Sequence, residues 1–217
     1  MPFDTETPRD AARQPVFNAP WPALALTGII VGGYLLQGFF PMEEVVRNGA
    51  FSAAALEEGR WQTAVTALFL HGSWPHALMN AGFALAFGTP VARCLGVRPA
   101  GVGMFVLFYL ACGVLANLAF AALHPGDPTP LVGASGAVSG LMAAAAQLIA
   151  GRGRPGPILS APVIGMGAGW LAVNLLVAFT GIAPGANGAI VAWEAHLAGF
   201  AAGLLLFRPA VWAVRRS

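Results

Sequence analysis

Six apolar segments, each long enough to form a helix in a membrane, constrain the fold of this chain more than any other feature. Of the 217 residues, 57% are apolar and only 9% are charged, which is far from the composition of a soluble globular domain. The chain is therefore predicted to be an all-α membrane protein with six transmembrane helices. The predicted spans are residues 21–40, 76–92, 101–123, 135–150, 159–180 and 189–207.

The arginines predict how these spans are oriented. Every basic residue is an arginine, and all except Arg47 and Arg60 fall on the side of the membrane that carries both termini. By the positive-inside rule that side is the cytoplasm. We expect an integral membrane protein with both termini in the cytoplasm, in a bacterial plasma membrane. The predicted parts are a cytoplasmic N-terminal tail (1–18), a membrane domain (19–209) and a cytoplasmic C-terminal tail (210–217).

The connection between the first two spans, residues 41–75, is unusually long. Its apolar and acidic residues alternate in short amphipathic pieces, which predict helices lying in the membrane interface. The other connections are short, and no linker indicates a second domain.

Ser135 begins the fourth apolar segment. Residues 124–130 before it cannot continue a helix, because three prolines lack the backbone donor and a glycine favours a turn. Arg152 and Arg154 close the segment about 25 Å farther along a helix, which is shorter than a bilayer crossing. If these arginines lie at one membrane face, Ser135 lies below the other face. The free N–H groups of a helix N-terminus would there favour a developing negative charge.

His196 is predicted to lie at the same depth as Ser135, about 18 Å from the cytoplasmic face. A histidine within hydrogen-bond reach makes a serine a usable nucleophile, so the pair is interpreted as nucleophile and general base. Taken singly, each residue is more often a packing or hydrogen-bonding residue, and only the combination favours catalysis. Small-residue spacings that allow close helix approach follow both residues: Gly136 and Gly140, and Gly199 and Gly203.

His76 and Asn80 are four residues apart and hence share one face of the second span. Both can donate hydrogen bonds and, with the Ser135 backbone N–H, could bind an oxyanion. The alternative is that Asn80 bonds a neighbouring backbone while His71 and His76 cap the entrance of the span. A metal site is disfavoured, because the chain lacks a His-Glu-x-x-His pattern and paired intramembrane carboxylates.

Taken together, these motifs closely resemble those of the rhomboid intramembrane serine proteases, from about residue 61 to residue 207. The resemblance implies a six-helix rhomboid-like bundle and a dyad without aspartate, in which Ser135 attacks a peptide bond and His196 transfers the proton. It also implies that transmembrane proteins are cleaved near the outer membrane face and that the fifth span is a lateral gate. The motifs are Gly133-Ala-Ser135-Gly136, His71 with His76 and Asn80, and Ala195-His196-x-x-Gly199-x-x-x-Gly203. By the same resemblance, His76, Asn80 and the Ser135 N–H bind the oxyanion, and His71 is structural.

This chain departs from the family pattern at Ser139, and it has a carboxylate, Glu194, two residues before His196. Many family members have a tyrosine four residues after the nucleophile that stacks on the histidine, whereas this chain has Ser139. Ser139 could orient His196 by a hydrogen bond, or Trp193 or an apolar side chain could pack there. Glu194 is about 200° around the helix from His196 and is expected to face the aqueous rim.

The sequence is also compatible with other functions. A catalytically inactive rhomboid-like protein that binds transmembrane segments is one alternative, and a small-solute channel or transporter is a weaker one. The absence of a lysine-rich patch argues against nucleic acid as a partner. The sequence indicates no cofactor. The expected partners are transmembrane substrates and the lipid bilayer, and the oligomeric state stays undetermined.

Overall fold

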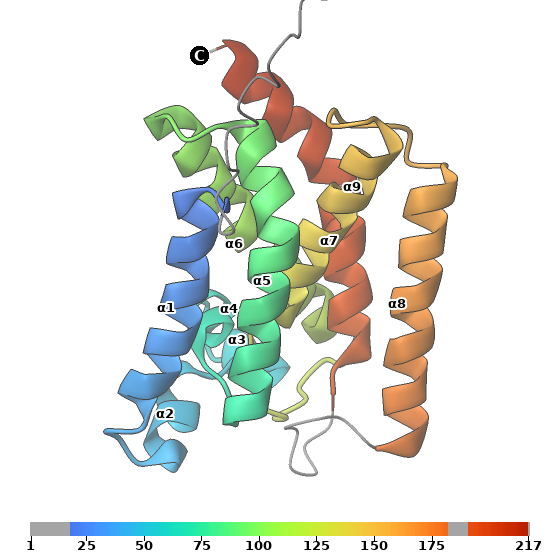
Figure 1. The fold of residues 1–217 in the computed structure, drawn as a ribbon. Helices are drawn as coiled ribbons and strands as arrows, with labels where there is room; N and C mark the ends of the chain where they lie inside the picture. The colour runs from blue at the N-terminus through green and yellow to red at the C-terminus, as the bar shows by residue number, and fades with distance from the viewer. Residues whose placement is uncertain (1–17, 182–190, 217) are drawn as a thin grey trace, which may run out of the picture.

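The structure is a computed structural model that describes residues 18–181 and 191–216. Within these ranges the regular elements are helices, and one isolated antiparallel bridge joins Phe51 and Leu131. This confirms the predicted all-α class. The helices are α1 (Trp21–Gln37), α2 (Met42–Gly49), α3 (Ala53–Glu57), α4 (Thr63–Thr66), the 3-10 helix η1 (Ala67–Phe69), α5 (Trp74–Leu95), α6 (Pro99–Leu123), α7 (Ser135–Ala150), α8 (Ala161–Thr180) and α9 (Trp193–Arg216) (Figure 1).

Four of the described helices, α5, α6, α8 and α9, are long and apolar enough to cross a membrane. The chain is therefore an integral membrane protein. Helices α1 and α7 are apolar but shorter, with 17 and 16 residues, so six crossings remain a prediction. At about 1.5 Å per residue, α7 is about 24 Å long and shorter than the hydrocarbon core of a bilayer.

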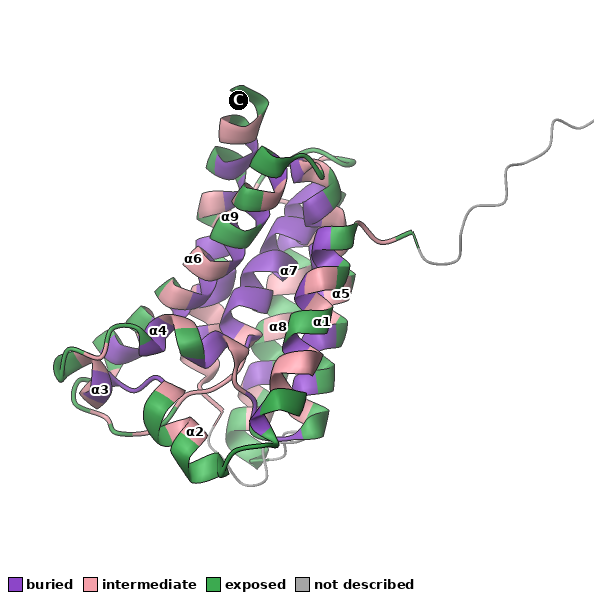
Figure 2. Cartoon of the chain, turned by 90° about the vertical axis from the view of Figure 1, so that its left-hand side faces the viewer, coloured by how far each residue is buried: buried purple, intermediate pink, exposed green. Residues whose placement is uncertain are grey.

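Helix α7 occupies the centre of the bundle, between α5, α6 and α9 (Figures 1 and 2). Residues 136–148 of this helix are all buried. Most of its side chains are those of glycine, alanine and serine, which let neighbouring helix backbones come close. Among the helices that the structure describes, Ser135 therefore begins the most deeply buried one.

The long first connection forms α2, α3, α4 and η1, which gather at one end of the bundle (Figure 2). Phe51 and Leu68 bury their side chains there, whereas α2 buries none of its residues. Phe51 also exchanges two backbone hydrogen bonds with Leu131, at 3.0 and 2.6 Å. This connection thereby supports the loop that leads into Ser135.

Helix α8 lies at the edge of the bundle and buries only Val163 and Asn174 (Figure 1). Most of its other side chains are at least partly exposed, as expected of a helix that faces lipid for much of its circumference. One polar side chain of α8 is thus turned away from lipid and into the bundle.

The last helix differs from its predicted end at residue 207. It continues through Pro209 to Arg216, because Ala210 and Val211 are buried against the core and packing outweighs the lost backbone bond. Residues 210–216 of the predicted C-terminal tail are therefore helical. Except for Asn18, the predicted tail 1–18 lies outside the described residues, as do residues 189 and 190 of the predicted last span.

Candidate active site

The loop before α7 brings Ser135 to its position through a glycine. Gly133 has a φ of +127°, a conformation that other residues rarely adopt, and its N–H donates to the Ala67 carbonyl oxygen at 2.9 Å. A Cβ added to Gly133 would lie 2.8 Å from His76 Nε2. Glycine is therefore required both by the backbone and by the imidazole packed against it.

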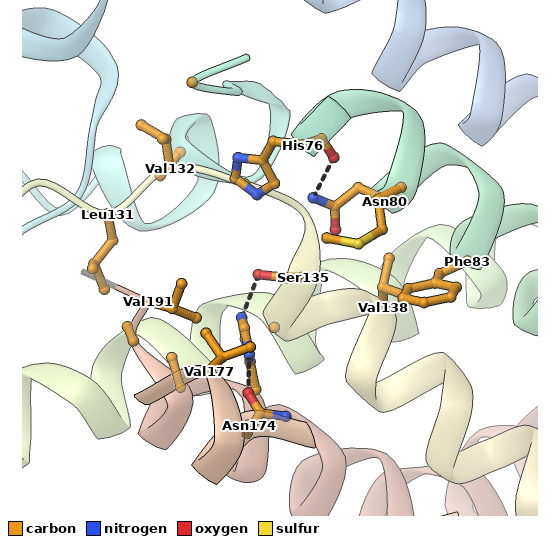
Figure 3. Close-up of a pocket in the computed structure, with 18 of the residues that line it drawn as sticks. His76, Asn80, Phe83, Leu131, Val132, Ser135, Val138, Asn174, Val177 and Val191 are labelled. Atoms are coloured by element: carbon orange, nitrogen blue, oxygen red, sulfur yellow. Dashed lines mark hydrogen bonds between the residues drawn. The ribbon is translucent and has the colours of Figure 1, made fainter. Parts of the chain in front are cut away.

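Helices α7 and α9 bring Ser135 and His196 into direct contact. Ser135 Oγ lies 2.7 Å from His196 Nε2, which is hydrogen-bond distance (Figure 3). The two glycine pairs make this approach possible, because a Cβ on Gly199 would overlap the Gly136 carbonyl and a Cβ on Gly203 would overlap that of Gly140. The helix backbones are therefore in contact at Gly136, directly after Ser135, and at Gly199, about one turn after His196.

Helix α8 supplies the groups that orient His196. Asn174 Oδ1 lies 2.6 Å from His196 Nδ1, on the side of the ring opposite Ser135 (Figure 3). The indole of Trp170 packs against the imidazole, with ring centroids 5.6 Å apart and planes tilted by 32°. Trp170 therefore packs on His196 in the place where the sequence suggested Trp193 or an apolar side chain.

Ser139 does not orient His196 by the direct hydrogen bond that the sequence left open. Its hydroxyl donates to the Ser135 carbonyl oxygen at 2.8 Å and accepts from Trp170 Nε1 at 3.1 Å. Ser139 thus acts on the imidazole only through the indole that it holds in place.

His76 and Asn80 lie on the wall of the cavity that contains Ser135 (Figure 3). The cavity has a volume of about 270 Å³, and α5, α7, α8 and α9 all contribute to its lining. Asn80 Nδ2 donates one hydrogen bond to the His76 carbonyl oxygen at 3.1 Å, and its second N–H has no part in that bond. Two side-chain donors therefore lie on the α5 side of Ser135.

His71 lies beneath this wall rather than in the cavity lining. Its side chain is buried, and its ring meets that of His76 edge-on with centroids 5.1 Å apart. Gln37 at the end of α1 holds its backbone by two hydrogen bonds, 2.9 and 3.0 Å long. Burial, with a smaller contribution from His76, lowers the pKa of His71 to about 3, so the ring is neutral at physiological pH.

Glu194 was expected to face the aqueous rim. Its carboxylate lies 3.3 Å from Nε2 of the partly exposed His124, at the end of α6, and 20% of its side chain is exposed. This pair joins the loop before α7 to the start of α9. Glu194 thus has a partner of its own, away from His196.

The sequence analysis missed the roles of Asn174 and Trp170. The signal was an amide and an indole four residues apart, hence on one face of the fifth apolar segment. A polar side chain inside a span usually faces the bundle interior, which made Asn174 conspicuous, but spacing alone does not reveal its neighbour.

The arrangement is suited to acyl transfer. An imidazole with an acceptor at Nδ1 presents its Nε2 lone pair to the serine hydroxyl and can take its proton. N–H donors on α5 and at the α7 N-terminus face the same space, where an oxyanion could be bound. The polar groups sit among apolar side chains such as Phe83 and Val177, as an enclosed binding site for an apolar segment requires.

Comparison with known proteins identifies the family. A model of the rhomboid domain matches residues 58–212, which is most of the chain. The chain is also similar to the rhomboid protease GluP of Bacillus subtilis, with 32% identity over 102 residues. That match covers 47% of this chain and 18% of the relative, so the chain spans only a small part of the length of that protein. The chain belongs to the rhomboid family.

Proposed function

We propose that the protein is an intramembrane serine endopeptidase that hydrolyses peptide bonds of transmembrane proteins by a Ser135/His196 dyad. The observation that carries the proposal is the 2.7 Å contact between Ser135 Oγ and His196 Nε2 inside a cavity lined also by His76 and Asn80. Membership of a family whose members are typically serine intramembrane proteases supports it.

In the first step His196 Nε2 takes the hydroxyl proton while Ser135 Oγ attacks the scissile carbonyl carbon. The carbonyl oxygen becomes an oxyanion, which His76, Asn80 and the Ser135 N–H would bind. The imidazolium then gives its proton to the departing amine, leaving an acyl ester on Ser135. Water, deprotonated by the same imidazole, hydrolyses the ester and restores the serine.

The substrate is a membrane-spanning segment in this proposal. A peptide bond inside a helix is shielded by the helix, so a segment with helix-destabilising residues is the preferred class. We propose that it enters beside α8, which is the least buried of the long helices. With cytoplasmic termini, the cavity would open to the periplasmic or extracellular side and supply water.

The proposal is tested with the purified full chain in liposomes, a single-span model substrate and a fluorescent fluorophosphonate that labels activated serines. We expect the parent to cleave the substrate and to be labelled, and Ser135→Ala to do neither, because the nucleophile is gone. A parent that binds substrates without cutting or labelling would favour the non-catalytic, segment-binding function instead.

Asn80→Ala is expected to lower kcat by about 10²-fold to 10³-fold, the usual cost of losing one oxyanion donor. KM should change little, because the oxyanion exists only after attack. Leu78→Ala is the matched control, since Leu78 lies on the same helix with 54% of its side chain exposed. An unchanged kcat for Asn80→Ala would remove Asn80 from the oxyanion site.

A further inference from the structure

Asn174 is an unusual side chain for its helix. It lies in α8, where only Val163 and Asn174 are buried, and its own exposure is 3%. A polar amide within a membrane helix is costly unless its hydrogen bonds are satisfied. Both ends of this amide have partners, and the two partners together determine how it is oriented.

The amide nitrogen of Asn174 donates to the carbonyl oxygen of Trp170 at 2.8 Å, one turn earlier in α8. Because a carbonyl can only accept, this bond assigns the nitrogen to that end of the amide. The atom that lies 2.6 Å from His196 Nδ1 is then Oδ1, which can only accept. His196 must therefore carry its proton on Nδ1.

This tautomer leaves a lone pair on His196 Nε2, the atom that faces Ser135 Oγ. The opposite tautomer would place a proton between the two groups and prevent the imidazole from accepting the hydroxyl proton. Trp170 adds a second restraint, because its indole packs on the ring and is itself held by Ser139. The ring is thus restrained both in tautomer and in orientation.

We propose that Asn174 is a positioning residue that holds His196 in the Nδ1–H tautomer, forming a Ser135–His196–Asn174 hydrogen-bonded chain. The inference rests on the proposed protease function. It also gives α8 a second part in the reaction, since the chain of bonds is complete only while α8 lies against α9. A displacement of α8 that admits a substrate would separate Asn174 from His196 until the helix returned.

Loss of Asn174 should lower kcat, and the effect of a wrong histidine tautomer in another serine protease gives its upper limit. A wrong tautomer in a serine protease of another fold lowers kcat by about 10⁴-fold. Asn174 is neutral and Trp170 still restrains the ring, so the loss should be smaller, about 10-fold to 100-fold. It should fall on kcat and on the rate of serine labelling, because both need the proton of Ser135 to be removed.

The experiment compares Asn174→Ala, Asn174→Leu and Asn174→Asp with the parent and with the α8 control Leu176→Ala, whose side chain is 63% exposed. Leucine keeps the branched shape of the amide and fills its space without an acceptor, so it serves if alanine destabilises the fold. Aspartate restores the acceptor. The measurements are the fluorophosphonate labelling rate, kcat and KM, the pH profile of labelling and the thermal unfolding midpoint. The small reagent does not require a transmembrane segment to pass α8.

We expect labelling and kcat to fall about 10-fold to 100-fold for the alanine or leucine variant at unchanged KM, and the control to match the parent. Asn174→Asp should recover most of the rate, and the acid limb of its pH profile should move up by about one unit because a carboxylate favours the imidazolium. If all Asn174 variants keep the labelling rate, the kcat and the pH profile of the parent, this inference is wrong while the proposed function stands. A parent that is never labelled at Ser135 would overturn the proposed function and this inference with it.

Discussion

Alanine in place of Ser135, of His196 or of both is expected to give three variants with one and the same residual cleavage rate. That rate should be on the order of 10⁴-fold to 10⁶-fold below the parent rate, as in other proteases whose nucleophile and base act as a unit. The reason is the single hydrogen bond of 2.7 Å that joins the two side chains. Once one partner is gone, the other has no reaction left to assist.

The measurement is a double-mutant cycle on kcat/KM with a single-span substrate in liposomes. Thermal unfolding of each variant controls for loss of the fold, because Ser135 and His196 are each only partly buried and their truncation should be tolerated. Additive losses, with the double variant far below both single variants, would show that the residues act independently. The dyad would then have to be abandoned.

Gly199→Ala is expected to cause a large loss of stability, about 3 kcal/mol in the free energy of unfolding. The added Cβ would overlap the backbone carbonyl of Gly136, which cannot rotate out of the way as a side chain would. Helices α7 and α9 would have to separate. Because His196 is one turn away, we also expect the contact with Ser135 to be lost and serine labelling to fall below detection.

A matched control is Gly103→Ala, on α6, where an added Cβ meets no atom within 4 Å. Alanine has the higher helix propensity, so this variant should equal or slightly exceed the parent in stability. Denaturant titration in detergent micelles measures both variants. A Gly199→Ala protein as stable as Gly103→Ala would mean that the two backbones are not in contact.

The sequence alone was sufficient to predict the all-α class, the apolar segments that form the long helices, and the start of α7. Hydropathy places apolar segments, and the prolines of residues 124–130 prevent any helix from continuing into Ser135. The small-residue spacing after Ser135 and after His196 indicated which helices could approach. These features are local, so they can be read without knowing the packing.

Only the tertiary structure determines which side chains hold His196 in place. The sequence left Ser139, Trp193 or an apolar residue as candidates, and the structure places Trp170 and Asn174 there. Apart from Asn174 and Thr180, helix α8 is apolar around its circumference, so hydrophobic periodicity does not reveal which face turns inward. Its rotation and depth are set by contacts with α7 and α9, as is the continuation of α9 beyond Pro209. Such contacts join residues distant in the chain, and only the folded bundle brings them together.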